Sequence, residues 1–165
     1  MKYIIGAILF LGIFIASILT IGFFLPEEHT ASVSIQINAP QKEIWNKIST
    51  PTNFPNWRDN VTKVEILSDS SESLVWKEIY SNGESLSFKE LSTQGSSLFV
   101  SEIIDDGLPF GGKWTITLKG NEDSTNITIV EKGKVYSSVY RFFSKFIFGH
   151  ERTIKEYLGY LEEVS

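Results

Sequence analysis

An uncharged, apolar stretch near the N-terminus constrains this chain more than any other feature. Residues 3–25 contain no Asp, Glu, Lys or Arg, and only glycine, serine and threonine interrupt the apolar side chains. A helix rises about 1.5 Å per residue, so this stretch would extend roughly 34 Å and cross a hydrocarbon core of about 30 Å. We therefore predict a transmembrane anchor over residues 1–25, a linker over 26–30 and one domain over 31–165.

A cleaved secretory signal is the alternative to a permanent anchor. A signal peptide has an apolar core of about 7–15 residues, followed by small residues at the cleavage site. The stretch here is longer and ends in the bulky residues Phe23, Phe24 and Leu25. Both features favour an uncleaved anchor.

The charges on either side of the anchor predict its orientation. Lys2 precedes the apolar stretch, whereas Glu27 and Glu28 follow it directly. Positive residues tend to stay in the cytoplasm, so we predict a cytoplasmic N-terminus and an extracytoplasmic domain. Small residues also recur every four positions, at Gly12, Ala16 and Thr20. This spacing can form a helix-packing face, so self-association through the anchor stays an alternative.

Composition excludes several classes of function. The 165 residues include 15 Lys and Arg against 20 Asp and Glu, with no basic run, so we expect no nucleic-acid partner. The absence of cysteine excludes a disulfide framework, a thiolate zinc site and a cysteine nucleophile. His29 lies in the predicted linker, far in sequence from any partner, and no Gly-x-Ser-x-Gly elbow or glycine-rich phosphate loop occurs. We predict no catalytic residue, metal or cofactor.

The domain begins with a strand and one or two short helices. Strict alternation of apolar residues over 32–37 predicts a half-buried strand. Residues 38–40 resemble a helix start, and 43–48 continue that helix. Pro51 and Pro55 break the next segment into turns or a second short helix.

Six strand-like segments follow, separated by segments rich in turn-forming residues. The strands are predicted over residues 61–67, 74–81, 85–92, 98–104, 113–119 and 126–135. The connections are residues 68–73, 82–83, 93–97, 105–112 and 120–124.

Apolar residues then recur at three- and four-residue steps over 139–161, which predicts a long amphipathic helix that Gly149 interrupts. Seven antiparallel strands with one apolar face need a cover, and this helix is the longest element of the domain. The fold class is therefore α+β, with a curved seven-stranded antiparallel sheet around a long C-terminal helix. A curved sheet of this kind can leave a cavity beneath the helix.

Several segments, in the expected order, resemble the SRPBCC (START-related, helix-grip) superfamily and its polyketide cyclase/dehydrase and lipid-transport branch. They are residues 35–45 with 54–57, residues 108–114, and residues 133–136, 141–143 and 148–149. The resemblance implies a helix-grip fold with a hydrophobic cavity for a lipid-like or polycyclic molecule. It implies no particular reaction, because carriers, cyclases, coenzyme Q-binding proteins and chaperone activators share the fold.

The hairpin around Asn82 and Gly83 predicts which residues of two strands face the cavity. A two-residue turn would place Lys77 opposite Phe88, and would put both of them with Glu90 on the more apolar face. The two charged residues would then orient a polar group of the ligand or snorkel to solvent at the sheet edge. A bulged turn would shift the register by one residue and remove this pairing.

His150 is the other polar candidate, because it lies on the apolar stripe of the C-terminal helix. It either forms a structural hydrogen bond at a helix kink or contacts the ligand. Aromatic residues from sheet, loop and helix complete the predicted lining, with Phe110 on a cavity rim over residues 105–112. The full set of predicted ligand-binding residues is Trp57, Lys77, Phe88, Glu90, Phe110, Trp114, Tyr136, Phe143, Phe146, His150 and Tyr157.

These observations predict membrane-anchored, non-catalytic binding of a hydrophobic or lipid-like small molecule. One alternative is a cyclase/dehydrase-like enzyme that uses Glu90, Lys77 or His150 as acid–base groups. The other is a protein-interaction module resembling the chaperone activators, in which the cavity would be collapsed.

Overall fold

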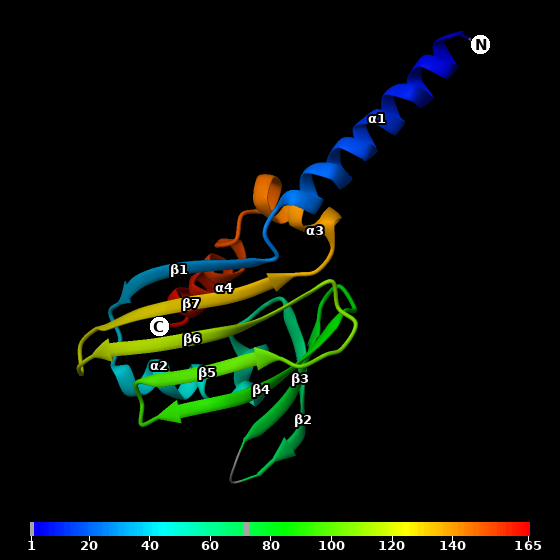
Figure 1. Cartoon of the computed structure of the whole chain (residues 1–165). Coiled ribbons are helices and arrows are strands. Elements are labelled where there is room, and N and C mark those ends of the chain that lie inside the picture. Colours follow the sequence, from blue (N-terminus) through cyan, green and yellow to red (C-terminus); the bar gives the residue numbers. More distant parts are fainter. Residues whose placement is uncertain (1, 71–72) are drawn as a thin grey trace.

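A computed structural model describes residues 2–70 and 73–165, and it shows a long N-terminal helix followed by an α+β domain (Figure 1). The sequence-based fold class is confirmed. The helical elements are α1 (Lys2–Phe24), α2 (Gln41–Ile48), η1 (Pro51–Asn56), α3 (Ser138–Phe143), η2 (Ser144–Phe148) and α4 (Arg152–Glu163). The strands are β1 (Glu28–Ile37), β2 (Val61–Asp69), β3 (Leu74–Tyr80), β4 (Ser85–Gln94), β5 (Leu98–Ile103), β6 (Phe110–Gly120) and β7 (Thr125–Val135).

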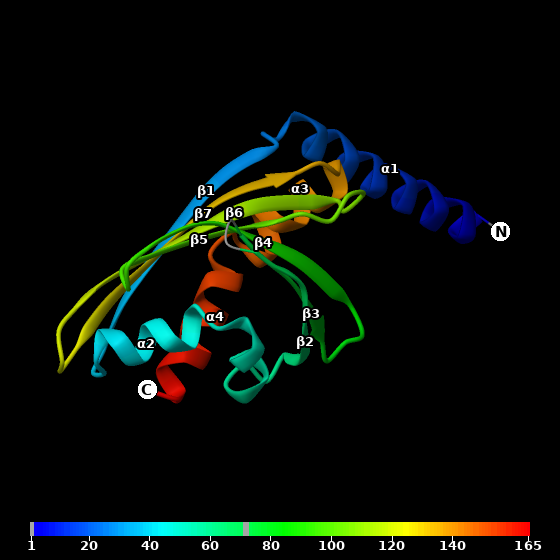
Figure 2. The same ribbon diagram turned by 90° about the horizontal axis from the view of Figure 1, so that it is seen from below.

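The strands form one antiparallel sheet in the order β1-β7-β6-β5-β4-β3-β2. The sheet curves around α4, while α2 and η1 lie across its open end (Figure 2). The predicted turn over residues 68–73 includes residues 71–72, which lie outside the described part of the chain. β1 begins at Glu28, paired with Lys134, so three residues of the predicted linker are hydrogen-bonded into the sheet.

The helix α4 supplies the apolar cover that the sheet requires. Its buried residues recur at three- and four-residue steps and pack into the core that the sheet forms with α2 and η1. They are Ile154, Tyr157, Leu158 and Leu161.

The predicted C-terminal helix is broken at Gly149 rather than only kinked there. The helical segment that starts at Ser138 ends as a single π-helical turn, and Gly149 then takes φ 74° and ψ 149°. The backbone of Gly149 is extended in ψ, so the chain changes direction before α4 begins. As a result α3 and η2 lie beside α1, and of these three C-terminal segments only α4 covers the sheet (Figures 1 and 2).

The register of the β3–β4 hairpin differs from the prediction. Gly83 has φ 85° and donates its N–H to Tyr80 O, and Tyr80 N–H bonds Glu84 O, which makes a three-residue loop with a glycine bulge. Trp76, not Lys77, therefore pairs with Phe88. The prediction that Lys77 shares the face of Phe88 was wrong, because the extra loop residue shifts every pair by one.

The helix α1 is long and apolar enough to cross a membrane, and its length matches the predicted anchor. Its side chains are exposed along almost the whole length, but its last turns contact α3. At Gly22 an added Cβ atom would overlap the carbonyl oxygen of Ser138, so only glycine permits this approach of the two backbones.

Candidate ligand-binding cavity

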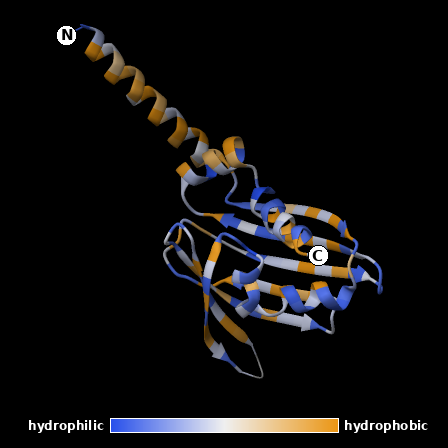
Figure 3. Cartoon of the chain, turned by 180° about the vertical axis from the view of Figure 1, so that it is seen from behind, coloured by the Kyte–Doolittle hydropathy of each residue, from blue (hydrophilic) through white to orange (hydrophobic). Residues whose placement is uncertain are grey.

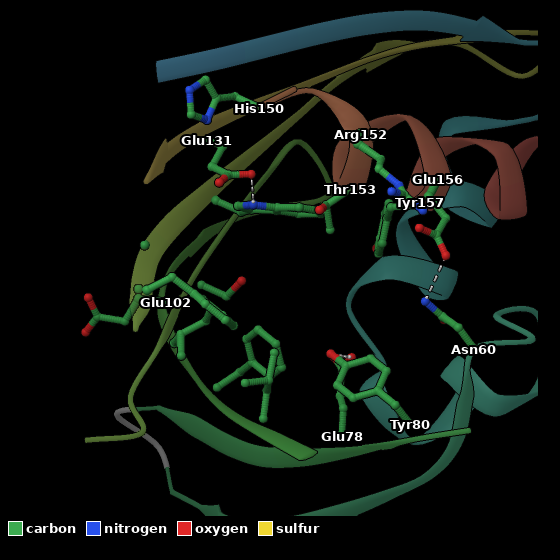
Figure 4. Close-up of a pocket in the computed structure, with 18 of the residues that line it drawn as sticks. Asn60, Glu78, Tyr80, Glu102, Glu131, His150, Arg152, Thr153, Glu156 and Tyr157 are labelled. Carbon is green, nitrogen blue, oxygen red and sulfur yellow. Dashed lines mark hydrogen bonds between the residues drawn. The ribbon is translucent and has the colours of Figure 1, made fainter. Parts of the chain in front are cut away.

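A cavity of about 680 Å³ lies between the concave face of the sheet and α4. Its walls are mainly aromatic and aliphatic, and its polar side chains include two groups at opposite ends, around Glu78 and around Glu131 (Figure 4). The apolar lining includes Phe54, Trp76, Leu86, Phe88, Phe99, Ile103, Phe110, Trp114, Ile116 and Tyr157. Within this lining the rings of Trp76 and Phe88 stack with their centroids 5.5 Å apart.

The first polar group surrounds the carboxylate of Glu78, which is only 3% exposed. Arg58 Nη1 lies 2.9 Å from Glu78 Oε2, and Tyr80 donates its hydroxyl to the same oxygen at 2.9 Å. Trp76 donates its indole N–H to the other oxygen, Glu78 Oε1, at 3.1 Å. One carboxylate thus accepts hydrogen bonds from three side chains, which is how a buried charge is retained.

Aromatic rings hold Arg58 in place over this carboxylate. Its guanidinium lies 5.1 Å from the ring centre of Phe54 and 5.3 Å from that of Tyr157. Burial alone would lower the pKa of Arg58, but the carboxylate of Glu78 together with Tyr157 and Tyr80 outweighs it, so the pKa lies above its ordinary value. Burial, followed by the charge of Glu78, raises the pKa of Tyr80, so Tyr80 is a neutral hydrogen-bond donor.

The second polar group lies at the opposite end, where β1, β6 and β7 meet the turn before α4. Glu131 accepts a hydrogen bond from Trp114 Nε1 at 2.9 Å, and its other oxygen lies 3.2 Å from His29 Nε2. The ring of His150 stacks on that of His29 at a centroid distance of 3.9 Å, and Ser144 Oγ lies 3.0 Å from its Nδ1. Figure 4 shows Glu131 and His150 together at this end, with Glu78 and Tyr80 across the cavity.

The stacked histidine predicts a dependence of stability on pH. Partial burial, then His29 and Lys145, lower the pKa of His150 below its ordinary value. As the pH falls, this histidine is protonated in the unfolded chain, where its pKa is about 6.5, before it is protonated in the folded chain. The free energy of unfolding therefore decreases as the pH drops below about 6.5. We expect His150→Gln to flatten this loss in urea unfolding between about pH 7.5 and 5.5. If wild type and variant lose the same stability over this pH range, the pH dependence does not arise from His150.

Five of the residues predicted from the sequence line the cavity, and the structure brings them together from β4, β6, α4 and the turn before α4. They are Phe88, Phe110, Trp114, His150 and Tyr157. Phe110 belongs to β6 itself, so the loop predicted over residues 105–112 is shorter and the rim is built on a strand.

The other six predicted residues are not part of the lining. Trp57 is buried beside Tyr157, Lys77 lies on the outer face opposite Ser87, and Phe143 packs on Phe142. Glu90 shares the face of Phe88 beyond the cavity, and its carboxylate accepts a hydrogen bond from Thr93. The remaining two, Tyr136 and Phe146, are more than half exposed.

Sequence reasoning missed the first polar group and, of the second, predicted only Trp114 and His150. Glu78 alternates with Trp76 and Tyr80, so a correct register would have placed it inside. Arg58 directly follows the aromatic segment 54–57, which was a usable signal. The pairing of His29 with Glu131 joins β1 to β7 across 102 positions of sequence, and no local pattern indicates it. Within residues 2–70 and 73–165, no cluster of three potential ligands could hold a metal ion.

Comparison with solved structures finds the same helix-grip architecture in other proteins, and the fold expected from the resemblance is confirmed. Norcoclaurine synthase from Thalictrum flavum superposes with a TM-score of 0.62 at 16% identity, over 83% of this chain and 86% of that one. The ZhuI aromatase/cyclase from Streptomyces sp. R1128 gives a TM-score of 0.62 at 12% identity, over 83% and 93%.

A protein from Thermus thermophilus gives a TM-score of 0.65 at 10% identity, over 82% of this chain and 95% of that one. Norcoclaurine synthase has also been solved in complex with dopamine and hydroxybenzaldehyde. No protein-family profile matches the chain, and no curated protein sequence is significantly similar to it.

Proposed function

We propose that this protein binds one hydrophobic or lipid-like small molecule in the helix-grip cavity and holds that cavity at a membrane through α1. The cavity itself carries the proposal. Its volume of about 680 Å³ falls within the range of roughly 300–1,000 Å³ of small-molecule sites, and apolar walls with a few placed polar groups are typical of such sites. An open cavity also weighs against a protein-interaction module with a collapsed interior.

The lining indicates the chemistry of the ligand. The rings of Trp76, Phe88 and Phe99 favour a flat or polycyclic apolar body. At one end each oxygen of Glu131 already has one partner, Trp114 or His29, and keeps a second lone pair that can accept from a hydroxyl or amine. At the other end Arg58 and Tyr80 donate to Glu78. We therefore expect a mainly apolar molecule with a polar group at the Glu131 end.

Tethering supports this role physically. A cavity attached to a transmembrane helix samples molecules dissolved in that bilayer at a high effective concentration. The length, hydropathy and exposure of α1 are those of such an anchor.

An enzyme acting on the same ligand is a second candidate, favoured by one contact. His29 and Glu131 form a 3.2 Å pair on the cavity wall, which can act as a general base. Lys77 cannot take this role because it lies on the outer face of the sheet. If the cavity is catalytic, His29→Gln will abolish turnover of the bound molecule and leave its binding near normal.

Native mass spectrometry of the full chain, purified in two detergents of different mass, tests the binding proposal. We expect an adduct of small-molecule mass that is the same in both detergents. Ser101 pairs with Trp114 on the concave face, so Ser101→Trp will fill the cavity and remove the adduct. Thr117→Trp, on the outer face of β6, is the matched control and will retain it. A wild-type chain that is always empty, or an adduct that survives Ser101→Trp, would refute the proposal.

A further inference from the structure

The segment that joins the sheet to α4 exposes an unusual number of large apolar side chains. In η2, Ile147 is 63% exposed, and its two neighbours are more than half exposed. Figure 3 shows this apolar coil directly beside the end of α1. The α3–η2 face, as we call it, consists of Tyr136, Val139, Tyr140, Phe146, Ile147 and Phe148.

Contacts fix this face at the level where α1 ends. The backbone of Gly22 lies against that of Ser138 at the start of α3. Arg141 donates from Nη1 to the carbonyl oxygen of Leu25 at 3.0 Å, and the same atom lies 3.8 Å from Glu27 Oε1. The last turn of the apolar helix and the α3–η2 face therefore meet the same layer of any bilayer that α1 crosses.

The charge of this part of the chain differs from that of the whole. The protein has a net charge of −5, but residues 132–150 contain four Lys and Arg and no Asp or Glu. Lys134 lies 3.5 Å from Glu28 and Arg141 lies 3.8 Å from Glu27, so the excess positive charge of this segment is that of Lys132 and Lys145. Aromatic side chains combined with basic residues are the composition of segments that lie in the interface of a bilayer with anionic lipids. Lys145, between Phe143 and Phe146, is exposed and could reach lipid phosphate.

We propose that the α3–η2 face is a second membrane contact, lying in the interface of the bilayer that α1 spans. This inference rests on the proposed anchor. Tyr140, Ser144 and Phe148 also line the cavity, so the segment in contact with lipid is at the same time a wall of the binding site. The cavity then opens toward the bilayer, and an apolar ligand passes between them without crossing water.

Single cysteines test this directly, because the chain has none of its own. We would place a nitroxide label at Ile147→Cys, at Ile13→Cys within α1, and at Glu122→Cys in the exposed β6–β7 turn. The full chain is reconstituted in vesicles of equal parts phosphatidylcholine and phosphatidylglycerol. Collision with oxygen, which enters lipid, is compared with collision with a water-soluble nickel complex.

We expect the label at position 147 to favour oxygen over nickel several-fold relative to position 122, and to be shallower than position 13. Lys145→Glu will reduce this preference in the anionic vesicles, while Lys42→Glu on the distant helix α2 will not. If nickel reaches position 147 as readily as position 122 while position 13 is protected, the second membrane contact is refuted and the anchor is not. Low access to both reagents at 147 would mean that a second copy of the chain covers the face, which also overturns it. Nickel access at 13 would refute the anchor as well.

Discussion

Glu78→Ala is expected to destabilise the domain by about 3–5 kcal/mol, the usual cost of removing one partner from a buried ion pair. The change leaves the guanidinium of Arg58, at 8% exposure, without its counter-ion. It also removes the acceptor for the Trp76 indole and the Tyr80 hydroxyl. Urea unfolding in dodecyl maltoside, followed by the fluorescence of the four tryptophans, measures the loss.

Two further variants separate the buried charge from general effects. Glu78→Gln keeps an acceptor for Trp76 and Tyr80 but loses the charge, so its cost should lie between those of wild type and Glu78→Ala. Lys155→Ala breaks an exposed pair with Glu151, four residues away on the helical surface, and should cost below about 0.5 kcal/mol. If Glu78→Ala is no worse than Lys155→Ala, water in the cavity solvates Arg58 and the pair is not desolvated.

The elements of this fold follow closely from local patterns in the sequence. The uncharged stretch predicts α1, alternation predicts the strands, and the three- and four-residue steps of Ile154, Leu158 and Leu161 predict the buried face of α4. These patterns are short in range because side-chain direction repeats every two residues in a strand and about every 3.6 in a helix. The order of elements was then enough for the fold class.

The site was harder to predict, because it depends on single-residue details and distant pairs. One glycine at φ 85° in the β3–β4 loop moved Lys77 to the outer face and brought Glu78 inside. A pattern of alternation cannot detect this, since strands 74–80 and 85–94 are mixed in polarity on both faces. The His29–Glu131 pair depends on β1 starting at Glu28 and lying beside β7, which is known only from the assembled sheet.

Sequence periodicity predicts an interruption of the C-terminal helix at Gly149, but not that the chain changes direction there. This change of direction has the largest consequence for function. The periodic apolar residues over 139–161 were assigned to one helix against the sheet. Only those from Ile154 onward face the core, whereas Phe146, Ile147 and Phe148 point to the exterior near α1. Periodicity shows that residues share a face but does not show what covers that face. Residues of one periodic pattern therefore belong to two different surfaces, the core and the α3–η2 face.

Leu161→Ala is expected to lower the free energy of unfolding by about 2–5 kcal/mol, because it deletes a fully buried side chain from the last turns of α4. Leu161 does not line the cavity, so the loss should appear in stability while ligand binding to the folded fraction stays unchanged. Its exposed neighbour provides the control: Glu162→Ala should change stability by no more than about 0.5 kcal/mol. A small loss at Leu161 would mean that the end of α4 separates from the sheet before the domain unfolds. The wall that α4 forms along the cavity would then move independently of the rest of the core, and the cavity could open on that side as well.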